Sequence, residues 1–169
     1  MTLSIYEASI PVFTQMLNSM SQVLAKAESH AIEKKIEPQA LLQARLYPDM
    51  FPLIRQVQIA ADFAKGVSAR LANVGVPAYD DTENSFADLQ SRIKKTLDFI
   101  ESLNPTQFEH AAEREVVLRP GTPKEKKFTG SGYLLSYGLP QFFFHVTTTY
   151  AILRHNGVEV GKADFMGLK

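Results

Sequence analysis

The chain of 169 residues lacks cysteine altogether. Without cysteine it can form no disulfide bond, cannot bind a metal through thiolates and has no cysteine nucleophile for catalysis. The fold therefore does not require an oxidising compartment.

The sequence also lacks an excess of either charge. Lysine plus arginine number 18, as do aspartate plus glutamate, so the formal net charge is zero. Proteins that bind nucleic acid usually carry a basic domain or stripe, and helices that bind a membrane surface usually carry a basic polar face. We therefore expect no nucleic-acid partner and no membrane partner.

Long apolar runs and targeting segments are missing too. No stretch of about 18 apolar residues predicts a membrane span. The first residues, Met1 to Glu7, have no basic segment of the kind that opens a signal peptide. We expect a cytoplasmic protein. Its length suits one domain with a sizeable core, which we place at residues 1–169.

What the sequence does contain is helical periodicity. Apolar residues recur at three- and four-residue spacing in four long segments, the pattern of amphipathic helices that pack on a core. These segments are residues 10–36, 49–71, 85–103 and 131–155. The fourth segment is so apolar that we expect most of it to be buried.

Prolines, glycines and capping residues indicate where these helices begin and end. Pro11 suits a first turn and would kink a helix that began earlier, at Ile5. Asp49 is a good N-cap for the second helix, and Gly75 is expected to be the left-handed cap beyond its end. Pro140 is expected to kink or restart the fourth helix.

Shorter segments connect the long helices. We expect a short helix at residues 39–46 and an exposed acidic loop at residues 76–84. Residues 115–119 and 125–128 favour strands on either side of a turn, which predicts a small hairpin. Gly157 is expected to end the fourth helix, and the tail beyond it is expected to be irregular.

Together these elements predict an all-α fold, a four-helix bundle with a small β-hairpin or ordered loop before the last long helix. Strict up-and-down order with short loops is the simpler topology. The long segment between the third and fourth helices allows a crossover connection instead.

The fourth helix carries the candidate site. His145 lies among aromatic residues, and Gln141 and Thr149 share its helix face because each is four residues away. Two roles are open for His145. It is either a packed histidine with one hydrogen bond inside an aromatic core, or a pocket residue that binds a ligand or transfers protons.

Motifs that would name a reaction are missing. The four histidines include no pair at the i, i+4 spacing of a metal site. The sequence also has no HExxH motif, no phosphate-binding glycine loop and no G-x-S-x-G motif. No motif therefore predicts a particular reaction.

Polar residues interrupt the second helix. Gln56, Gln58 and Asp62 lie in an otherwise apolar stretch, so they either point to solvent or bridge neighbouring helices. Lys65 and Arg70 are expected to be solvated charges of the helix surface.

Apolar residues also suggest a partner. The run Phe142–Phe144 is expected to lie in the core or in a dimer interface. Because the first helix also has apolar residues to spare, we expect a homodimer.

Six segments carry a resemblance to a known family: Phe51–Gln58, Ala64–Gly66, Arg92–Ile93, Leu139–His145, Tyr150–Gly157 and Gly161–Phe165. With these motifs the chain resembles the DinB/YfiT-like superfamily of four-helix bundles. Within that superfamily it looks like an uncharacterised branch, a domain of unknown function. The motifs span most of the chain.

The resemblance also implies where a site lies. Superfamily members typically hold a divalent metal with one histidine of the second helix and two of the last helix, and some are thiol-dependent transferases. Here these positions correspond to Gln56, Gln141 and His145. Glutamine is a poor ligand for zinc or nickel, so the resemblance implies a degenerate metal site that holds no cofactor.

We accordingly expect Gln56, Gln141 and His145 to converge in a partly buried pocket that binds a small molecule, with Tyr150 on the neighbouring wall. Two other functions stay open. One is a divalent-metal-dependent enzyme of the thiol-transferase type. The other is a purely structural, dimerising helical module.

Overall fold

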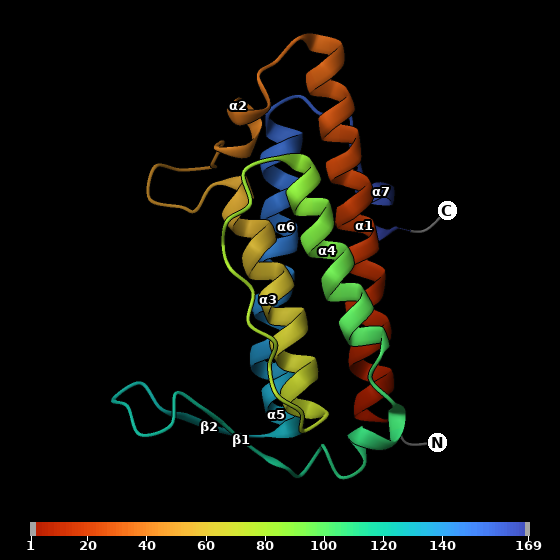
Figure 1. The fold of residues 1–169 in the computed structure, drawn as a ribbon, viewed down its shortest axis with the longest axis vertical. Helices are drawn as coiled ribbons and strands as arrows, with labels where there is room; N and C mark the ends of the chain where they lie inside the picture. The colour runs from red at the N-terminus through yellow and green to blue at the C-terminus, as the bar shows by residue number, and fades with distance from the viewer. Residues whose placement is uncertain (1–2, 168–169) are drawn as a thin grey trace.

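The computed structural model describes residues 3–167 and contains a bundle of four long helices (Figure 1). These helices are α1 (Ile5–Lys34), α3 (Leu53–Leu71), α4 (Phe86–Glu101) and α6 (Leu139–His155). Helices α4 and α6 lie diagonally across the bundle, and each packs against both α1 and α3, which also contact each other. The all-α, four-helix-bundle prediction is therefore confirmed.

The crossover connection lies elsewhere than the sequence suggested. Helices α3 and α4 run in the same direction, so residues 72–85 return along the whole bundle between them (Figure 1). The longer segment between α4 and α6 joins two helix ends at the same end of the bundle. The segment between α4 and α6 was expected to allow the crossover because it is long. Its length is instead used by the hairpin.

Buried charges attach the crossover segment to the bundle. The side chain of Arg92 on α4 is only 1% exposed and pairs with Asp62 at 2.9 Å, Asp81 at 3.1 Å and Glu83 at 2.9 Å. Arg55 also pairs with Asp81. Asp81 and Glu83 are thus ion-pair partners within a segment that is, as expected, largely exposed.

Lys65 is likewise not the solvated charge that the sequence suggested. It is 5% exposed, lies 2.9 Å from Asp62, and its ammonium group lies 3.8 Å from the ring centre of Tyr79. A lysine can be buried in this way because a carboxylate and an aromatic face together replace its water shell.

The first helix begins earlier than predicted. It starts at Ile5, where Ser4 and Glu7 form a capping box, and Pro11 lies inside it. The capping box satisfies free amide groups of the first turn. This stabilises a start at Ile5 although Pro11 supplies no amide to the helix.

The predicted caps of the second long helix were also wrong. Helix α3 begins after Pro52 rather than at Asp49, and the short helix before it, α2, covers Pro38–Leu42. Beyond the end of α3, Asn73 takes the left-handed conformation, with φ 56°, that was expected for Gly75. The amide of Val74 donates to the Ala69 carbonyl, which completes a Schellman motif around Asn73.

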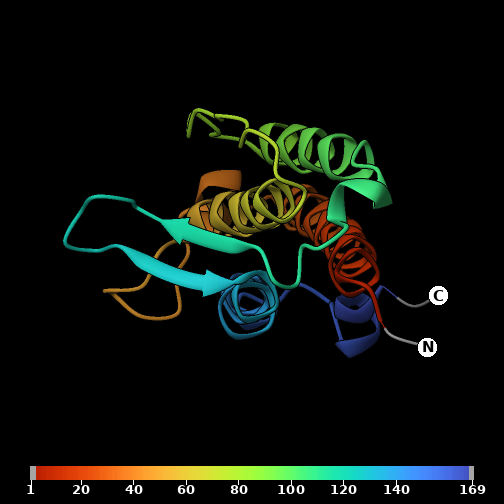
Figure 2. The ribbon, with the colours of Figure 1, turned by 90° about the horizontal axis from the view of Figure 1, so that it is seen from below.

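The predicted hairpin is present. Strand β1 (Glu115–Leu118) pairs antiparallel with β2 (Lys126–Thr129), and Val116 lies opposite Phe128. A 3-10 turn, η1 (Pro105–Phe108), precedes it. Figure 2 shows the hairpin extending away from the bundle beside α3 and the start of the last helical segment.

The last helical segment consists of three pieces. It begins as α5 (Gly130–Tyr133), passes through the π-helical turn η2 (Leu134–Gly138) and continues as α6. The predicted interruption at Pro140 therefore coincides with a change of helix type just before the proline. Gly138 packs closely here, because a Cβ atom on it would lie 2.7 Å from Cγ2 of Val67.

The tail contains a helix that was not predicted. Gly157, with φ +88°, follows the end of α6 as expected, but α7 (Lys162–Met166) then packs against α1. Ser19 donates to the Asp164 carbonyl at 2.7 Å, and Lys26 pairs with the Asp164 carboxylate at 2.6 Å. The last two residues, which the tail prediction included, lie outside the described residues.

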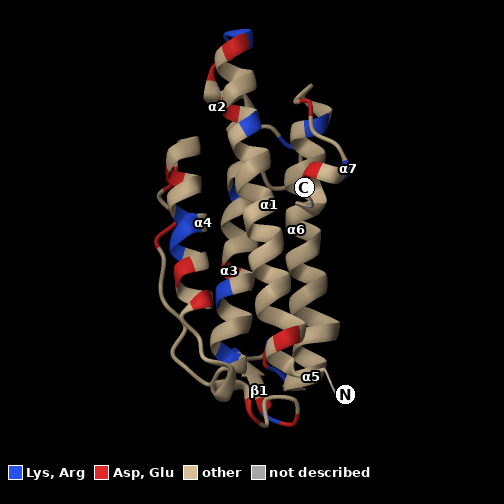
Figure 3. Cartoon of the chain, turned by 90° about the vertical axis from the view of Figure 1, so that its right-hand side faces the viewer, with Lys and Arg blue, Asp and Glu red and all other residues tan. Residues whose placement is uncertain are grey.

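Charge is unevenly distributed over the surface. Along α4 a basic block, Arg92 to Lys95, lies between acidic residues, whereas α6 carries a single Lys, Arg, Asp or Glu residue, Arg154 (Figure 3). Within residues 3–167, no helix is both long and apolar enough to cross a membrane.

Candidate functional site

Gln56 of α3 and His145 of α6 are in direct contact between their helices. Nδ1 of His145 lies 2.7 Å from Oε1 of Gln56. The amide nitrogen of Gln56 donates to the Phe51 carbonyl at 3.0 Å. The Phe51 carbonyl thereby fixes the orientation of the amide, so Gln56 presents its oxygen to the histidine.

This orientation determines the tautomer of His145. An amide oxygen only accepts hydrogen bonds, so Nδ1 carries the proton and Nε2 keeps a free lone pair. Nε2 has no hydrogen-bond partner within residues 3–167, and it is not among the fully buried polar atoms without a partner. It therefore keeps some contact with solvent, although the residue as a whole is only 7% exposed.

Burial keeps the ring neutral. Removal from water, with a smaller contribution from the Arg55 guanidinium, lowers the pKa of His145 from 6.5 to about 4. A buried imidazolium would lose its hydration and would be repelled by a cation, so the neutral form is favoured. At neutral pH the free Nε2 is therefore a hydrogen-bond acceptor.

Aromatic rings hold the imidazole on two sides. Phe63 stacks on it with ring centres 5.9 Å apart, and Phe144 meets it edge-on at 5.2 Å. Phe144 is itself 55% exposed, as is Phe51 at the start of α3. His145 is thus packed among aromatic rings, and one of its ring nitrogens keeps some contact with solvent.

Gln141 lies one turn away rather than in the same hydrogen-bonded group. It is half-buried beside an open hollow of about 230 Å³, whose other walls are Ser136, Tyr137, Pro140 and Phe144. Within residues 3–167 no hydrogen bond joins its side chain to Gln56 or His145. The structure thus brings two of the three expected residues into contact and places the third at an adjoining hollow.

Tyr150 does not line this region. It packs against Phe165 of α7, with ring centres 5.7 Å apart, and borders a narrow gap beside α1. Five residues at about 100° each turn a helix to a position about 140° round from the start. Tyr150 therefore points away from the face that carries His145.

The side chains at this site do not suit a resident divalent metal. Within the described part of the chain, no three His, Asp or Glu side chains come close enough to share an ion. Oxygen Oε1 of Gln56 is already occupied by the Nδ1–H group of His145. One imidazole and a glutamine amide are a poor donor set for zinc or nickel, so no reaction step is assigned to a metal.

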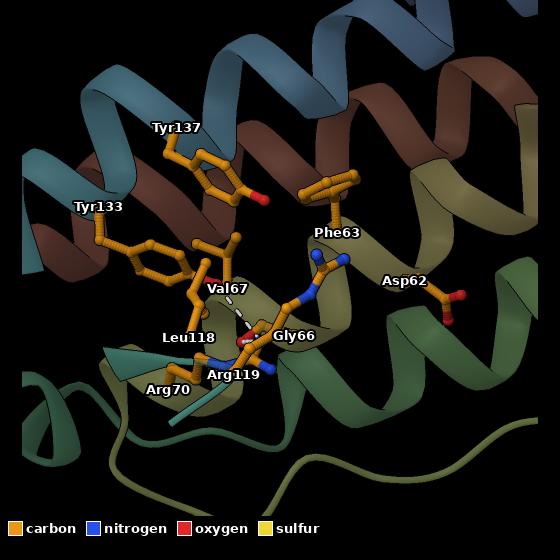
Figure 4. A pocket seen from close by; sticks show the side chains of 9 residues that line it. All are labelled: Asp62, Phe63, Gly66, Val67, Arg70, Leu118, Arg119, Tyr133 and Tyr137. Carbon is orange, nitrogen blue, oxygen red and sulfur yellow. Dashed lines mark hydrogen bonds between the residues drawn. The ribbon is translucent and has the colours of Figure 1, made fainter. Parts of the chain in front are cut away.

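A second group of polar residues forms a site that the sequence did not predict. A cavity of about 200 Å³ lies between α3, the end of β1 and the residues that lead into α6 (Figure 4). It is lined by Asp62, Phe63, Gly66, Val67, Arg70, Leu118, Arg119, Tyr133 and Tyr137. Arg70, expected to be solvated, is half-buried there, and the i, i+4 spacing of the two tyrosines was the only signal in the sequence.

Comparison with known proteins places the chain in a family. The family described as Domain of unknown function (DUF1993) matches residues 5–166. The crystal structure of a DinB family member protein from Shewanella denitrificans matches with a TM-score of 0.92 and 40% sequence identity, over 98% of this chain and 93% of that one. None of the curated proteins matches. The chain therefore belongs to the DUF1993 family, a branch of the DinB-like four-helix bundles.

Proposed function

We propose that the protein binds a small molecule, without a metal, at the open face of His145 between α3 and α6. One observation carries this proposal: Gln56, held by the Phe51 carbonyl, leaves the lone pair of Nε2 without a partner within residues 3–167 and in some contact with solvent. A well-positioned acceptor beside exposed aromatic rings is typical of ligand sites, in which a few polar groups orient a mainly apolar contact.

The neighbouring side chains support the same role. Phe144 and Phe51 offer apolar surface, and Gln141, one helical turn away, offers both a donor and an acceptor. A ligand that fits has a hydroxyl or amide donor for Nε2 and a flat apolar part for the phenylalanines.

The low pKa of His145 favours binding over acid–base catalysis. A general base works best when its pKa lies near the operating pH, whereas that of His145 lies at about 4. Such an imidazole accepts a hydrogen bond at neutral pH but holds a transferred proton poorly. The proposal therefore assigns it a binding role.

A thermal-shift screen of small molecules against the untagged protein tests the proposal. We expect ligands that raise the melting temperature of the wild type and leave that of His145→Ala unchanged. His155→Ala, which alters an exposed histidine at the end of the same helix, is the control and should keep the shift. A shift that survives His145→Ala would place binding elsewhere.

Metal content separates this proposal from a metal-dependent transferase. Protein purified without an affinity tag should contain far less than one equivalent of zinc, nickel or iron. One bound equivalent that is lost in His145→Ala would overturn the proposal in favour of the enzyme. No metal and no ligand from a broad screen would leave a structural, dimerising module as the function.

A further inference from the structure

We infer that the cavity between α3 and the β-hairpin binds the carboxylate group of a small organic acid. The inference rests on the charges and shape of this cavity and does not depend on ligand binding at His145. Its central residues are Arg70 and Arg119, with the phenol groups of Tyr133 and Tyr137 beside them (Figure 4).

The two arginines have no acidic partner of their own. Within residues 3–167, neither Arg70 nor Arg119 forms an ion pair. The one carboxylate at the cavity, that of Asp62, is already shared by Lys65 and Arg92, each at 2.9 Å. The cavity therefore carries uncompensated positive charge on a half-buried guanidinium, a state that an incoming anion stabilises.

The guanidinium of Arg70 is held in place. Its Nη1 donates to the Gly66 carbonyl at 3.0 Å and lies 3.3 Å from the hydroxyl of Tyr133. A Cβ atom on Gly66 would lie 2.8 Å from this same nitrogen, so the glycine makes room for the group. A guanidinium fixed in this way loses little further freedom on binding and can meet a carboxylate with two parallel hydrogen bonds.

The phenols add neutral donors. Burial raises the pKa of Tyr133, so its hydroxyl keeps its proton at neutral pH and brings no negative charge into the cavity. Arg119 completes the polar side from the hairpin, where it takes a left-handed conformation with φ 52°. That conformation is strained for a residue with a side chain.

The apolar walls and the volume of the cavity restrict which ligands fit beside the arginines. Phe63, Val67 and Leu118 form apolar walls. The volume of about 200 Å³ is smaller than the roughly 300–1,000 Å³ of sites for drug-sized ligands. The fitting class is therefore a small acid with a short apolar or aromatic body.

Benzoate is a suitable probe, and benzyl alcohol, of similar shape but uncharged, is its control. In ¹⁵N-labelled wild-type protein, benzoate should shift the amide signals of Gly66, Arg70 and Arg119 saturably, with Kd in the roughly millimolar range. Benzyl alcohol should bind at least about tenfold more weakly, because it forms no charge-assisted hydrogen bond. Equal binding of both, or no shifts with benzoate, would overturn the inference.

Two variants test the assigned residues. Arg70→Gln should weaken benzoate at least about tenfold. Gly66→Ala keeps every charge but displaces the guanidinium, so it should also weaken benzoate while the protein stays folded. Arg154→Gln, which removes an exposed cation from α6, is the matched control and should bind as wild type. Unchanged affinity in both Arg70→Gln and Gly66→Ala would contradict the assignment. Because His145 is intact in all three variants, this result is independent of the His145 proposal.

Discussion

At the scale of single residues, the protonation of His145 is determined by its neighbours. The Phe51 carbonyl orients Gln56, Gln56 fixes the proton on Nδ1, and burial lowers the pKa of the ring. The charge state of the open Nε2 atom is therefore determined by contacts on the opposite side of the ring.

The lowered pKa of His145 predicts a pH-dependent stability. Between pH 6.5 and about 4 the unfolded chain binds a proton that the folded protein does not, so the stability falls as the pH is lowered through this range. Between pH 7 and 4.5 we expect His145 alone to contribute a loss of roughly 2–3 kcal/mol. Urea unfolding of the wild type and of His145→Gln at both pH values measures this difference.

The control for this titration is His155→Gln, which removes an exposed histidine from the end of the same helix. It should retain the full loss of stability at low pH. If His145→Gln lost as much stability as the wild type, His145 would not be the titrating group.

At the scale of elements, the crossover segment between α3 and α4 depends on Arg92. This guanidinium binds three carboxylates, of which that of Glu83 is the most buried. Two further polar groups of α3 reach the same segment, since Arg55 binds Asp81 and Gln58 donates to Glu83 at 2.8 Å. The crossover segment has no helical hydrogen bonds of its own, and these side-chain contacts hold it on the bundle.

Replacement of Arg92 should release this segment. Arg92→Met keeps the bulk of the side chain but leaves the carboxylates unpaired, so we expect a loss of about 2–4 kcal/mol, since breaking a buried ion pair strands its partner charges. Amide hydrogen exchange should accelerate within residues 76–84. Lys94→Met, which breaks the exposed pair with Asp98 on the same helix, should cost less than about 1 kcal/mol. Equal effects of the two variants would rule out the proposed role of Arg92.

The elements that the sequence predicted well are those with local signals. Apolar spacing located the four long helices, and the turn residues after Arg119 located the hairpin. The path of the crossover and helix α7 depend on contacts between different elements, such as those of Arg92 with Glu83 and of Ser19 with Asp164. The start of α1 has a local signal, the Ser4–Glu7 capping box, which the prediction overlooked in favour of Pro11. Periodicity within one segment contains no information about such partners.

The candidate sites likewise divide into one that the sequence indicated and one that depends on contacts between separate elements. Family resemblance and helix spacing pointed to Gln56 and His145, which meet in the structure. The cavity of Arg70 was missed because its walls come from three elements far apart in the chain. Whether either site holds a ligand stays a prediction.

At the scale of the whole molecule, the homodimer also stays a prediction, and the structure restricts how it can form. Phe142 is fully buried against Phe13 and is not available to a partner, so of the two expected locations, core or dimer interface, this residue takes the core. Phe144 and Phe51 are exposed near His145 and offer an apolar contact surface.

Sedimentation equilibrium tests dimer formation through this face. The wild type should sediment at twice the 18.9 kDa of one chain, and Phe144→Glu should shift it to the monomer by placing a charge in the contact. Leu3→Glu, which changes an exposed apolar residue ahead of α1, should remain dimeric. A wild type that sediments as a single chain at high concentration would exclude the homodimer.

The parallel course of α3 and α4 has a consequence for how the molecule folds. Of the long helices that follow one another in the chain, α1 and α3 share only a small interface, α3 and α4 are parallel and separated by the crossover segment, and α4 and α6 lie on opposite sides of the bundle. The larger interfaces therefore each wait for the closure of a long loop. Because folding slows as contacts become less local, this bundle should fold more slowly than an up-and-down bundle of equal size, a difference that stopped-flow refolding would measure.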